Sequence, residues 1–156
     1  MAIADDSAAD LVTEYVTVTI GDHLFGLPIF RVQDVFVPAR LTRVPLAPPE
    51  VAGILNLRGR VVTAIDMRSR LDLGARAPGM PVMAIGIELK GEFYGLLVDS
   101  VGEVLQLRNA ACEANPANLA PGLSRMAAGI YRLEGQLMVV LDVDRVLDTQ
   151  NGAVAA

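Results

Sequence analysis

The chain has 156 residues, a formal net charge of −5 and one cysteine, and 53% of its residues are hydrophobic. This length accommodates one domain or two small subdomains that share a core, and the lone Cys112 excludes an internal disulfide or a multi-cysteine metal site. The negative charge argues against nucleic acid as the main partner, and no apolar run reaches the roughly 18–20 residues of a membrane-spanning helix. Because the N-terminus lacks a basic or apolar signal region, the chain is predicted to be cytoplasmic.

The first fifty residues predict short strands joined by turns. Residues 1–12 are small and acidic and predict a disordered tail. Tyr15–Ile20 alternates apolar and threonine side chains and Leu24–Leu27 follows a Gly-Asp-His turn, so the two runs predict a β-hairpin. Val32–Val37 is typical of another short strand. The proline-rich stretch 41–49 excludes a long helix, and residues 50–54 predict a single helical turn.

The stretch from Gly53 to Leu71 places an arginine on a tight loop. Asn56-Leu57-Arg58-Gly59 predicts a turn, and the β-branched run 61–65 predicts a buried strand that ends at Asp66. Rigid scaffolds present binding residues on loops of this kind. Arg58 is therefore predicted to be available to a partner.

The second half of the chain repeats the first. Gly26 aligns with Gly95, 69 positions later, and the segment 57–66 aligns with 133–142, 76 positions later. The extra residues of the second copy fall between 107 and 129, where 123–128 predicts a helical turn. We interpret the repeat as a duplicated all-β unit with about five short strands in each copy.

Closing each copy into a small barrel would protect its strand edges. The predicted fold is therefore mainly β, with two five-stranded barrel subdomains side by side, roughly 15–75 and 80–147, and short helical turns. They form a single domain over 13–150, followed by a tail at 151–156. The seam between the barrels should be buried, and replacing Ile65 or Leu141 with alanine should cost about 2–5 kcal/mol.

No pattern in the sequence predicts catalysis, a metal or a cofactor. The sole histidine, His23, lies in a predicted turn, and Cys112 lies beside Glu113, which does not favour a thiolate. Asp66 and Asp142 occupy equivalent repeat positions, where the expected role is to end a strand by bonding to the backbone. A small-barrel nucleic-acid-binding module is the alternative function, although four Phe, three Tyr and no Trp leave few side chains for base stacking.

Four ordered segments of the sequence resemble the CheW family of chemotaxis coupling proteins, from about Tyr15 to Leu147. They are EYVTVTIGDHLFGLPIFRVQDV, GILNLRGRVVTAIDMRSRL, FYGLLVDSVGEVL and GIYRLEGQLMVVLDVDRVL. The resemblance implies two intertwined SH3-like barrels. It also implies a non-enzymatic adaptor that joins chemoreceptor cytoplasmic tips to the regulatory domain of a CheA-type histidine kinase. Such an adaptor is cytoplasmic, recruited to membrane-associated receptor arrays, and needs no cofactor.

The resemblance also implies two sets of contact residues. The kinase-facing set is Val32, Gln33, Asp34 and Val35, with Val32 and Val35 supplying exposed apolar contacts. The receptor-facing set is Gly53, Asn56, Arg58, Val61, Met83, Val101 and Val104. Structural roles stay open for several of them: the three valines of the receptor-facing set could be core residues, Gly53 and Gly59 could serve turn geometry, and Arg58 could pair with Asp34.

Overall fold

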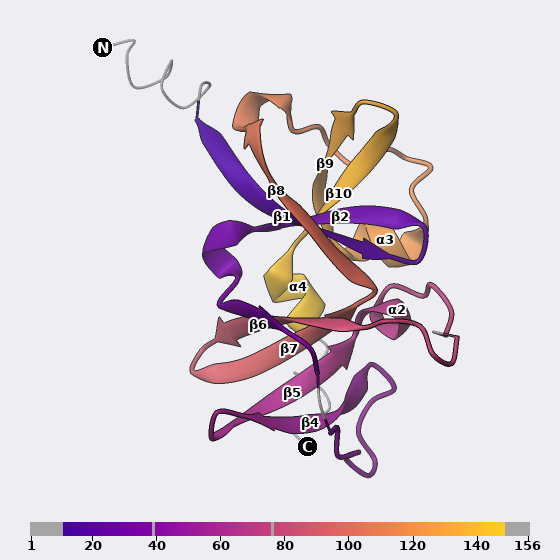
Figure 1. Cartoon of the computed structure of the whole chain (residues 1–156). Helices are drawn as coiled ribbons and strands as arrows, with labels where there is room; N and C mark the ends of the chain where they lie inside the picture. The colour runs from indigo at the N-terminus through magenta and orange to yellow at the C-terminus, as the bar shows by residue number, and fades with distance from the viewer. Residues whose placement is uncertain (1–10, 39, 76, 149–156) are drawn as a thin grey trace.

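The computed structural model describes residues 11–38, 40–75 and 77–148, which form two five-stranded sheets (Figure 1). One sheet has the strand order β8-β1-β2-β10-β9, with β1 at Val12–Ile20, β2 at His23–Pro28, β8 at Ser100–Arg108, β9 at Ala127–Leu133 and β10 at Gln136–Leu141. The other has the order β3-β6-β7-β5-β4, with β3 at Asp34–Phe36, β4 at Val51–Leu57, β5 at Arg60–Asp66, β6 at Met83–Leu89 and β7 at Glu92–Val98. The predicted mainly-β fold is confirmed.

Each sheet curls so that the chain beyond one edge strand meets the other edge strand. Glu113, which follows β8, pairs with Ile130 of β9 in an isolated antiparallel bridge. Thr42, which follows β3, pairs in the same way with Ile54 of β4. Both sheets therefore close as small barrels, which we name barrel 1 (β1, β2, β8, β9 and β10) and barrel 2 (β3 to β7).

The two barrels have the same topology, and they exchange hairpins between the two halves of the chain. The strand order of barrel 1 becomes that of barrel 2 when five is added to β1 and β2 and subtracted from β8, β9 and β10, so β1 and β2 correspond to β6 and β7. Hairpin β1–β2, from the first half of the chain, joins barrel 1 through parallel pairing of β2 with β10. Hairpin β6–β7, from the second half, joins barrel 2 through parallel pairing of β7 with β5.

The two barrels were expected to interleave, with rough bounds of 15–75 and 80–147, and these bounds do not match the strand sets because each barrel takes strands from both halves of the chain. Barrel 2 takes its strands from 34–98, and barrel 1 takes its strands from 12–28 and 100–141. A sequence repeat identifies which segments are equivalent, but backbone hydrogen bonding across the sheet decides which segments share a barrel.

Several local predictions are confirmed and others need correction. The predicted first hairpin is present, although β1 begins at Val12, inside the predicted tail; the predicted tail segments 1–10 and 151–156 lie outside the described residues. Residues 51–57 form strand β4 rather than a helical turn, because their backbone pairs with β5. The predicted strand 32–37 is shortened to β3, with the 3-10 turn η1 (Ile29–Arg31) before it.

The helices are short and mark equivalent positions in the two barrels. Helix α2 (Met67–Arg70) follows β5 and helix α4 (Val143–Leu147) follows β10, while α3 (Pro121–Met126) and the 3-10 turn η2 (Asn109–Ala111) lie in the longer connection. Asp66 Oδ1 accepts a hydrogen bond from the backbone N–H of Arg68 at 3.0 Å, and Asp142 Oδ1 accepts one from that of Arg145 at 3.2 Å. The predicted backbone role of the two aspartates is thus confirmed as helix N-capping. No helix in the described ranges is long and apolar enough to cross a membrane.

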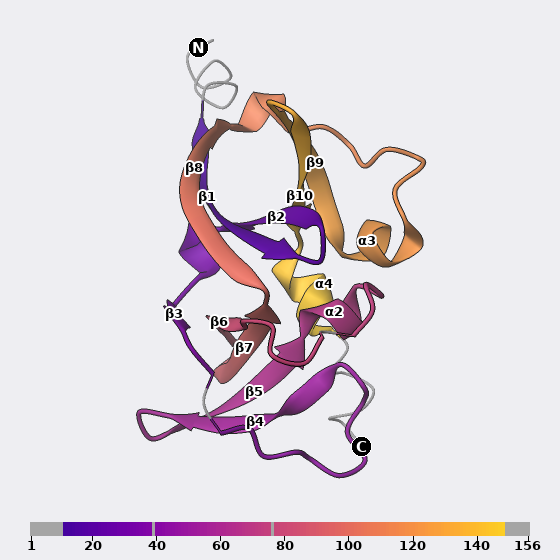
Figure 2. The same cartoon turned by 45° about the vertical axis from the view of Figure 1, so that its right-hand side comes forward.

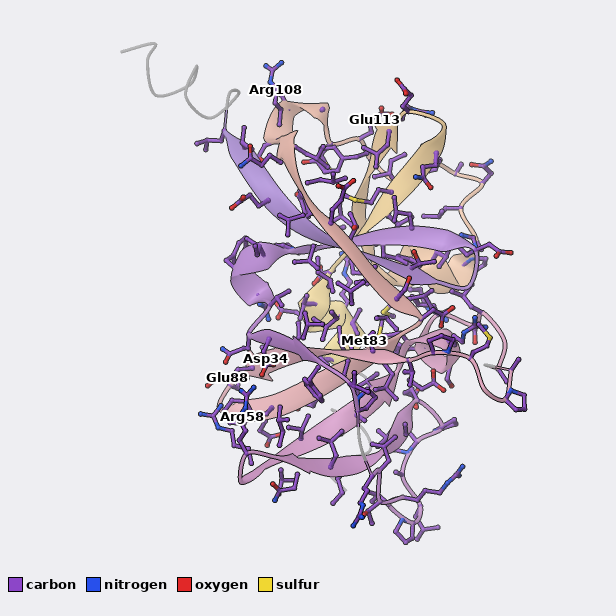
Figure 3. All side chains as sticks on the ribbon, viewed as in Figure 1. Asp34, Arg58, Met83, Glu88, Arg108 and Glu113 are labelled. Atoms are coloured by element: carbon purple, nitrogen blue, oxygen red, sulfur yellow. The ribbon has the colours of Figure 1, made fainter. Side chains whose placement is uncertain are left out.

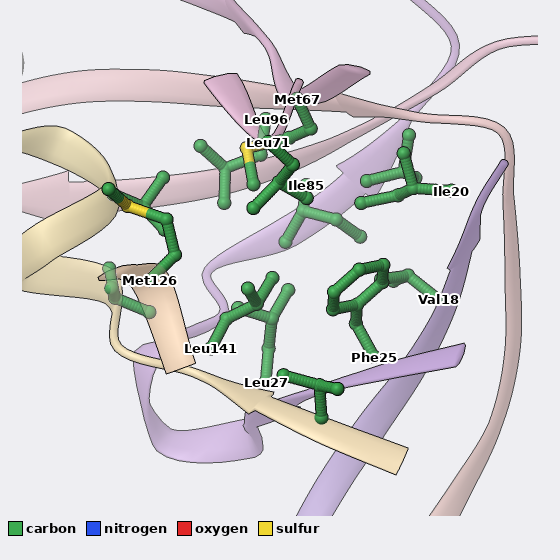
Figure 4. Close-up of a cluster of buried hydrophobic side chains, with 14 of the residues drawn as sticks. Val18, Ile20, Phe25, Leu27, Met67, Leu71, Ile85, Leu96, Met126 and Leu141 are labelled. Atoms are coloured by element: carbon green, nitrogen blue, oxygen red, sulfur yellow. The ribbon is translucent and has the colours of Figure 1, made fainter. Parts of the chain in front are cut away.

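The largest hydrophobic cluster fills the seam between the barrels (Figure 4). It joins side chains from both barrels, and they come in pairs 69 positions apart along the sequence: Val16 and Ile85, Val18 and Ile87, Phe25 and Tyr94, Leu27 and Leu96. Two smaller clusters fill the individual barrels. Ile65 and Leu141 are buried in the seam, as predicted. Burial of one shared apolar seam makes the two barrels a single structural unit.

A buried ion pair joins helix α2 to the connection between β7 and β8. Arg68 of α2 binds Asp99 through two contacts, Nε to Oδ1 at 3.0 Å and Nη2 to Oδ2 at 2.6 Å. Asp99 is the one residue between β7 and β8, and its Oδ2 also accepts from the backbone N–H of Gly21 in the β1–β2 turn. This hydrogen bonding raises the pKa of Arg68. The chain thus crosses from barrel 2 to barrel 1 at a fixed point beside α2 (Figure 2).

Candidate protein-binding surfaces

The β4–β5 turn presents Arg58 by means of left-handed backbone geometry. Leu57 pairs with Arg60, so only Arg58 and Gly59 connect the strands, with φ values of 53° and 83°. Two-residue hairpin loops of this hand match the twist of the strands. Asn56 Oδ1 accepts a hydrogen bond from the backbone N–H of Gly59 at 2.9 Å, which holds the turn. Gly59 therefore serves turn geometry, and Arg58 extends into solvent.

Arg58 contacts Asp34 at the end of barrel 2. Its Nη1 lies 3.4 Å from Asp34 Oδ2, and the guanidinium stays mostly exposed (Figure 3). The internal pairing that the sequence left open is therefore present. An exposed pair with this separation contributes little to folding stability. Arg58 is thus positioned by Asp34 and remains accessible to a partner.

A cavity of about 180 Å³ opens beside this pair and reaches the interior of barrel 2. Its lining includes Phe93, whose ring centroid lies 4.4 Å from the Arg60 guanidinium in a cation–π contact. Tyr94 lines the same cavity and donates a hydrogen bond from its hydroxyl to Glu92 Oε1 at 3.0 Å. Burial, together with this hydrogen bond, raises the pKa of Tyr94 to about 12. The lining of the cavity therefore combines aromatic side chains with the charged Asp34, Arg58 and Arg60.

The four consecutive residues predicted to face a kinase have different environments. Val35 projects outward and is 41% exposed, and Gln33 is exposed and donates to Glu88 Oε1 at 3.3 Å. Val32 is half-buried and packs against the seam cluster, so the prediction that it is an exposed apolar contact is wrong. Strand β3 is only three residues long, and Val32 lies before it, where the chain leaves the seam.

The structure divides the seven predicted receptor-facing residues into two groups. Gly53, Asn56, Arg58 and Val61 lie on hairpin β4–β5, and Val61 is 64% exposed. Met83 lies on β6, away from Arg58 (Figure 3), while Val101 and Val104 lie on β8 of the other barrel. Val104 is exposed, whereas Met83 and Val101 are half-buried against the seam cluster. The side chain of Val101 is therefore partly packed in the core, whereas those of Val61 and Val104 are not core residues.

Sequence reasoning missed two exposed apolar residues near Val35. Phe30 on η1 and Val37 after β3 are both largely exposed. The exposure of Phe30 could have been predicted, because Phe30 follows Pro28 and lies outside the predicted strands, where no sheet would bury its side chain. These residues add exposed apolar side chains just before and just after β3 in the sequence.

The residues that the structure describes contain no cluster of potential metal ligands. There, no group of three or more His, Cys, Asp or Glu side chains could hold a metal ion. Cys112 is exposed, and Asp66 and Asp142 cap separate helices.

Known proteins share both the sequence pattern and the fold. The family model described as CheW-like domain matches residues 14–151, which include both barrels. The chain belongs to the CheW-like domain family. The chemotaxis protein CheW of Rhizobium meliloti is 29% identical over 143 residues, covering 91% of this chain and 92% of that protein. The chemotaxis protein CheW of Bacillus subtilis is 26% identical over 131 residues, covering 84% of each.

A solved structure extends the likeness to three dimensions. The crystal structure of scaffolding protein TtCheW from Thermoanaerobacter tengcongensis is similar with a TM-score of 0.77 and 27% identity, covering 85% of this chain and 86% of that chain. The predicted resemblance to the CheW family and the two-barrel fold are therefore confirmed. Residues 34–98 of barrel 2 carry most of the predicted contact residues of this CheW-like chain.

Gly53 has a structural role in the CheW-like fold. It lies at a register shift between β4 and β5, and a Cβ atom there would approach the backbone oxygen of Thr42 to 2.6 Å. We expect Gly53→Ala to lower the free energy of unfolding by about 1–3 kcal/mol, because the alanine would strain the Thr42–Ile54 bridge that closes barrel 2. Urea unfolding would measure this loss. Gly59→Ala, with no atom within 4 Å of the added Cβ, tests the cost of the left-handed backbone alone.

Proposed function

We propose that this chain is a non-enzymatic scaffold that couples chemoreceptor cytoplasmic tips to the regulatory domain of a CheA-type histidine kinase. The observation that carries the proposal is the match of both barrels to CheW-like proteins, one of them described as a scaffolding protein. The protein would act in the cytoplasm at membrane-associated receptor arrays, without a cofactor. Its working parts would be surfaces rather than a reaction centre.

The kinase-facing surface would be centred on β3. Val35 is exposed there, and the neighbouring Val37 and Phe30 extend the apolar area. A related barrel of the kinase could cover such a patch, because the burial of apolar side chains drives most protein association. Asp34 and Gln33 would supply polar contacts at its edge, each already oriented by a neighbour.

The receptor-facing surface would use exposed aliphatic side chains and one directional cation. Val61 and Val104 are available for the apolar stripe of a helical hairpin, the secondary structure that a receptor tip presents. Arg58 could bind a carboxylate or carbonyl at the edge of that helix. Met83, Val101 and Gly53 would support this surface through packing rather than by direct contact.

Replacing Val35 with arginine is expected to weaken binding of the CheA regulatory domain at least tenfold. A charge placed in an apolar contact loses hydration without gaining a partner, which costs about 2–5 kcal/mol. Titration calorimetry would measure the affinity. Leu137→Arg is the matched control, because Leu137 on barrel 1 is 40% exposed. Wild-type affinity of the Val35 variant would refute the kinase-facing assignment.

Replacing Arg58 with alanine is expected to leave the melting temperature unchanged and to weaken capture of the receptor tip. The Asp34 contact is exposed, so its loss should change stability by less than about 1 kcal/mol. A pulldown with receptor-tip fragments together with a thermal melt would check both parts. Lys90→Ala is the matched control, since Lys90 occupies a hairpin turn with a φ of 52°. Equal capture by both variants would count against a role for Arg58.

A further inference from the structure

The hydrophobic cores of the two barrels are built from side chains of different size. The buried residues of the barrel 1 cluster include two tyrosines and a methionine; they are Tyr15, Tyr131, Met138 and Val140. The repeat offsets of 69 and 76 positions match these four with smaller buried residues of the barrel 2 cluster, which are Ala84, Leu55, Val62 and Ala64. Phe36 and Phe93 of barrel 2 match leucines of barrel 1 and compensate for only part of the difference. The core of barrel 2 is therefore filled by fewer side-chain atoms than that of barrel 1.

Barrel 2 also contains the cavity of about 180 Å³ beside Asp34 and Arg58. The apolar side chains of its lining are Phe36, Leu57, Val62, Ile87 and Phe93. Gly86 and Val62 belong to the lining, and barrel 1 has a larger threonine and methionine at the matching positions. A cavity of about 150 Å³ with apolar walls accommodates a benzene ring. The cavity of barrel 2 can therefore hold an apolar body of one ring.

Arg60 supplies unused hydrogen-bond donors to this cavity. Its guanidinium lies 4.4 Å from the ring centroid of Phe93, and both residues belong to the lining. Within the part of the chain that the structure describes, Arg60 makes no ion pair and no hydrogen bond. The cation–π contact positions the guanidinium, and a planar guanidinium with free N–H groups is suited to bind a carboxylate through two hydrogen bonds.

The other charged groups around the cavity already have partners. Within the lining, Arg58 Nη1 lies 3.4 Å from Asp34 Oδ2. Outside the lining, Glu88 and Glu92 accept hydrogen bonds from lining residues at 3.3 Å and 3.0 Å. Among the described residues, the uncompensated charge of the lining is therefore that of Arg60, which favours an anionic ligand over a cationic one.

We propose that this cavity binds a small aromatic monocarboxylate, whose carboxylate accepts hydrogen bonds from Arg60 and whose ring lies against the apolar lining of barrel 2. Burial of the ring and the charge-assisted hydrogen bonds would act together. A carboxylate without a ring would keep only the contact with Arg60, and a ring without a charge would keep only the apolar contacts. The inference goes beyond the proposed function and does not depend on it, because it uses only the core and the cavity of barrel 2.

Titration of the full chain with four small compounds tests the ligand chemistry. The probe is benzoate, and its matched compounds are benzyl alcohol, benzylammonium and acetate. These remove the charge, reverse the charge and remove the ring, respectively. Amide NMR spectra would follow each titration, with the signals of Gly86 and Phe93 as reporters of the cavity.

Two variants test the site by installing the residue that barrel 1 has at the matching position. Arg60→Gln copies Gln136 and removes the cation, and Val62→Met copies Met138 and fills part of the cavity. Lys90→Gln is the control, because it removes a cation that does not belong to the lining. Thermal melts would check that each variant is folded.

We expect benzoate to bind saturably with a dissociation constant of about 1 mM, which is typical of a ligand with so few atoms. Each matched compound should bind at least about fivefold more weakly, as should benzoate to Arg60→Gln and to Val62→Met, whereas Lys90→Gln should change the affinity less than about twofold.

Four results would overturn the inference. They are shifts that grow linearly with benzoate or are scattered over the surface, binding of acetate or benzyl alcohol equal to that of benzoate, tighter binding of benzylammonium, and unchanged affinity of Arg60→Gln. If Val62→Met does not fold, Arg60→Gln decides the outcome, because the side chain of Arg60 is exposed and its replacement leaves the core unchanged.

Discussion

Replacing Phe25 with alanine is expected to lower the free energy of unfolding by about 3–5 kcal/mol. Phe25 lies on β2, has no exposed surface and packs in the seam between the barrels. The alanine would remove apolar burial from both barrels and leave a cavity that the surrounding strands cannot fill without moving. Because the seam joins the barrels, both should lose stability together in one transition.

Phe30→Ala is the matched control for this prediction. Phe30 is 77% exposed, and its removal should change stability by no more than about 0.5 kcal/mol. Urea unfolding followed by circular dichroism and by tyrosine fluorescence would report on the whole chain. Two separate transitions in the Phe25 variant, or a loss similar to that of Phe30→Ala, would contradict the idea of a shared core.

Dividing the chain between α2 and β6 is expected to leave two fragments that do not fold alone but assemble when mixed. Fragment 1–78 contains β1 to β5 and fragment 79–156 contains β6 to β10. Each fragment therefore holds only some of the strands of each barrel. A two-stranded hairpin is at best marginally stable in water, and each fragment would expose its half of the seam.

Amide NMR spectra of the separate and mixed fragments would measure this assembly, with the intact chain as the reference. Poorly dispersed spectra for each fragment and a native-like spectrum for the mixture are expected. A well-dispersed spectrum from either fragment alone would mean that a half-chain folds independently, which would contradict the shared seam.

Features that depend on neighbouring residues could be predicted from the sequence. The turn at Asn56–Gly59 follows from the preferences of Asn and Gly for turn geometry, and the roles of Asp66 and Asp142 follow from the capping ability of a short carboxylate. Burial of Ile65 and Leu141 follows from their place in apolar runs. The resemblance to the CheW family also rested on ordered local segments.

Features that depend on distant parts of the chain could not be predicted in this way. The parallel pairing of β2 with β10 joins residues more than a hundred positions apart, and nothing local to either strand specifies it. The partial burial of Val32 depends on where the chain leaves the seam, and the exposure of Val61 depends on which face of β5 points outward.

The hairpin exchange also sets an order of events during synthesis on the ribosome. All five strands of barrel 2 have been translated by Val98, whereas β1 and β2 must wait for β10, which ends at Leu141. At about 5–20 residues per second, the nascent N-terminal hairpin spends several seconds without its last partner strand. During that interval the free edge of β2 is open to pairing with other chains, so we expect the nascent chain to be exposed to aggregation until β10 has been translated.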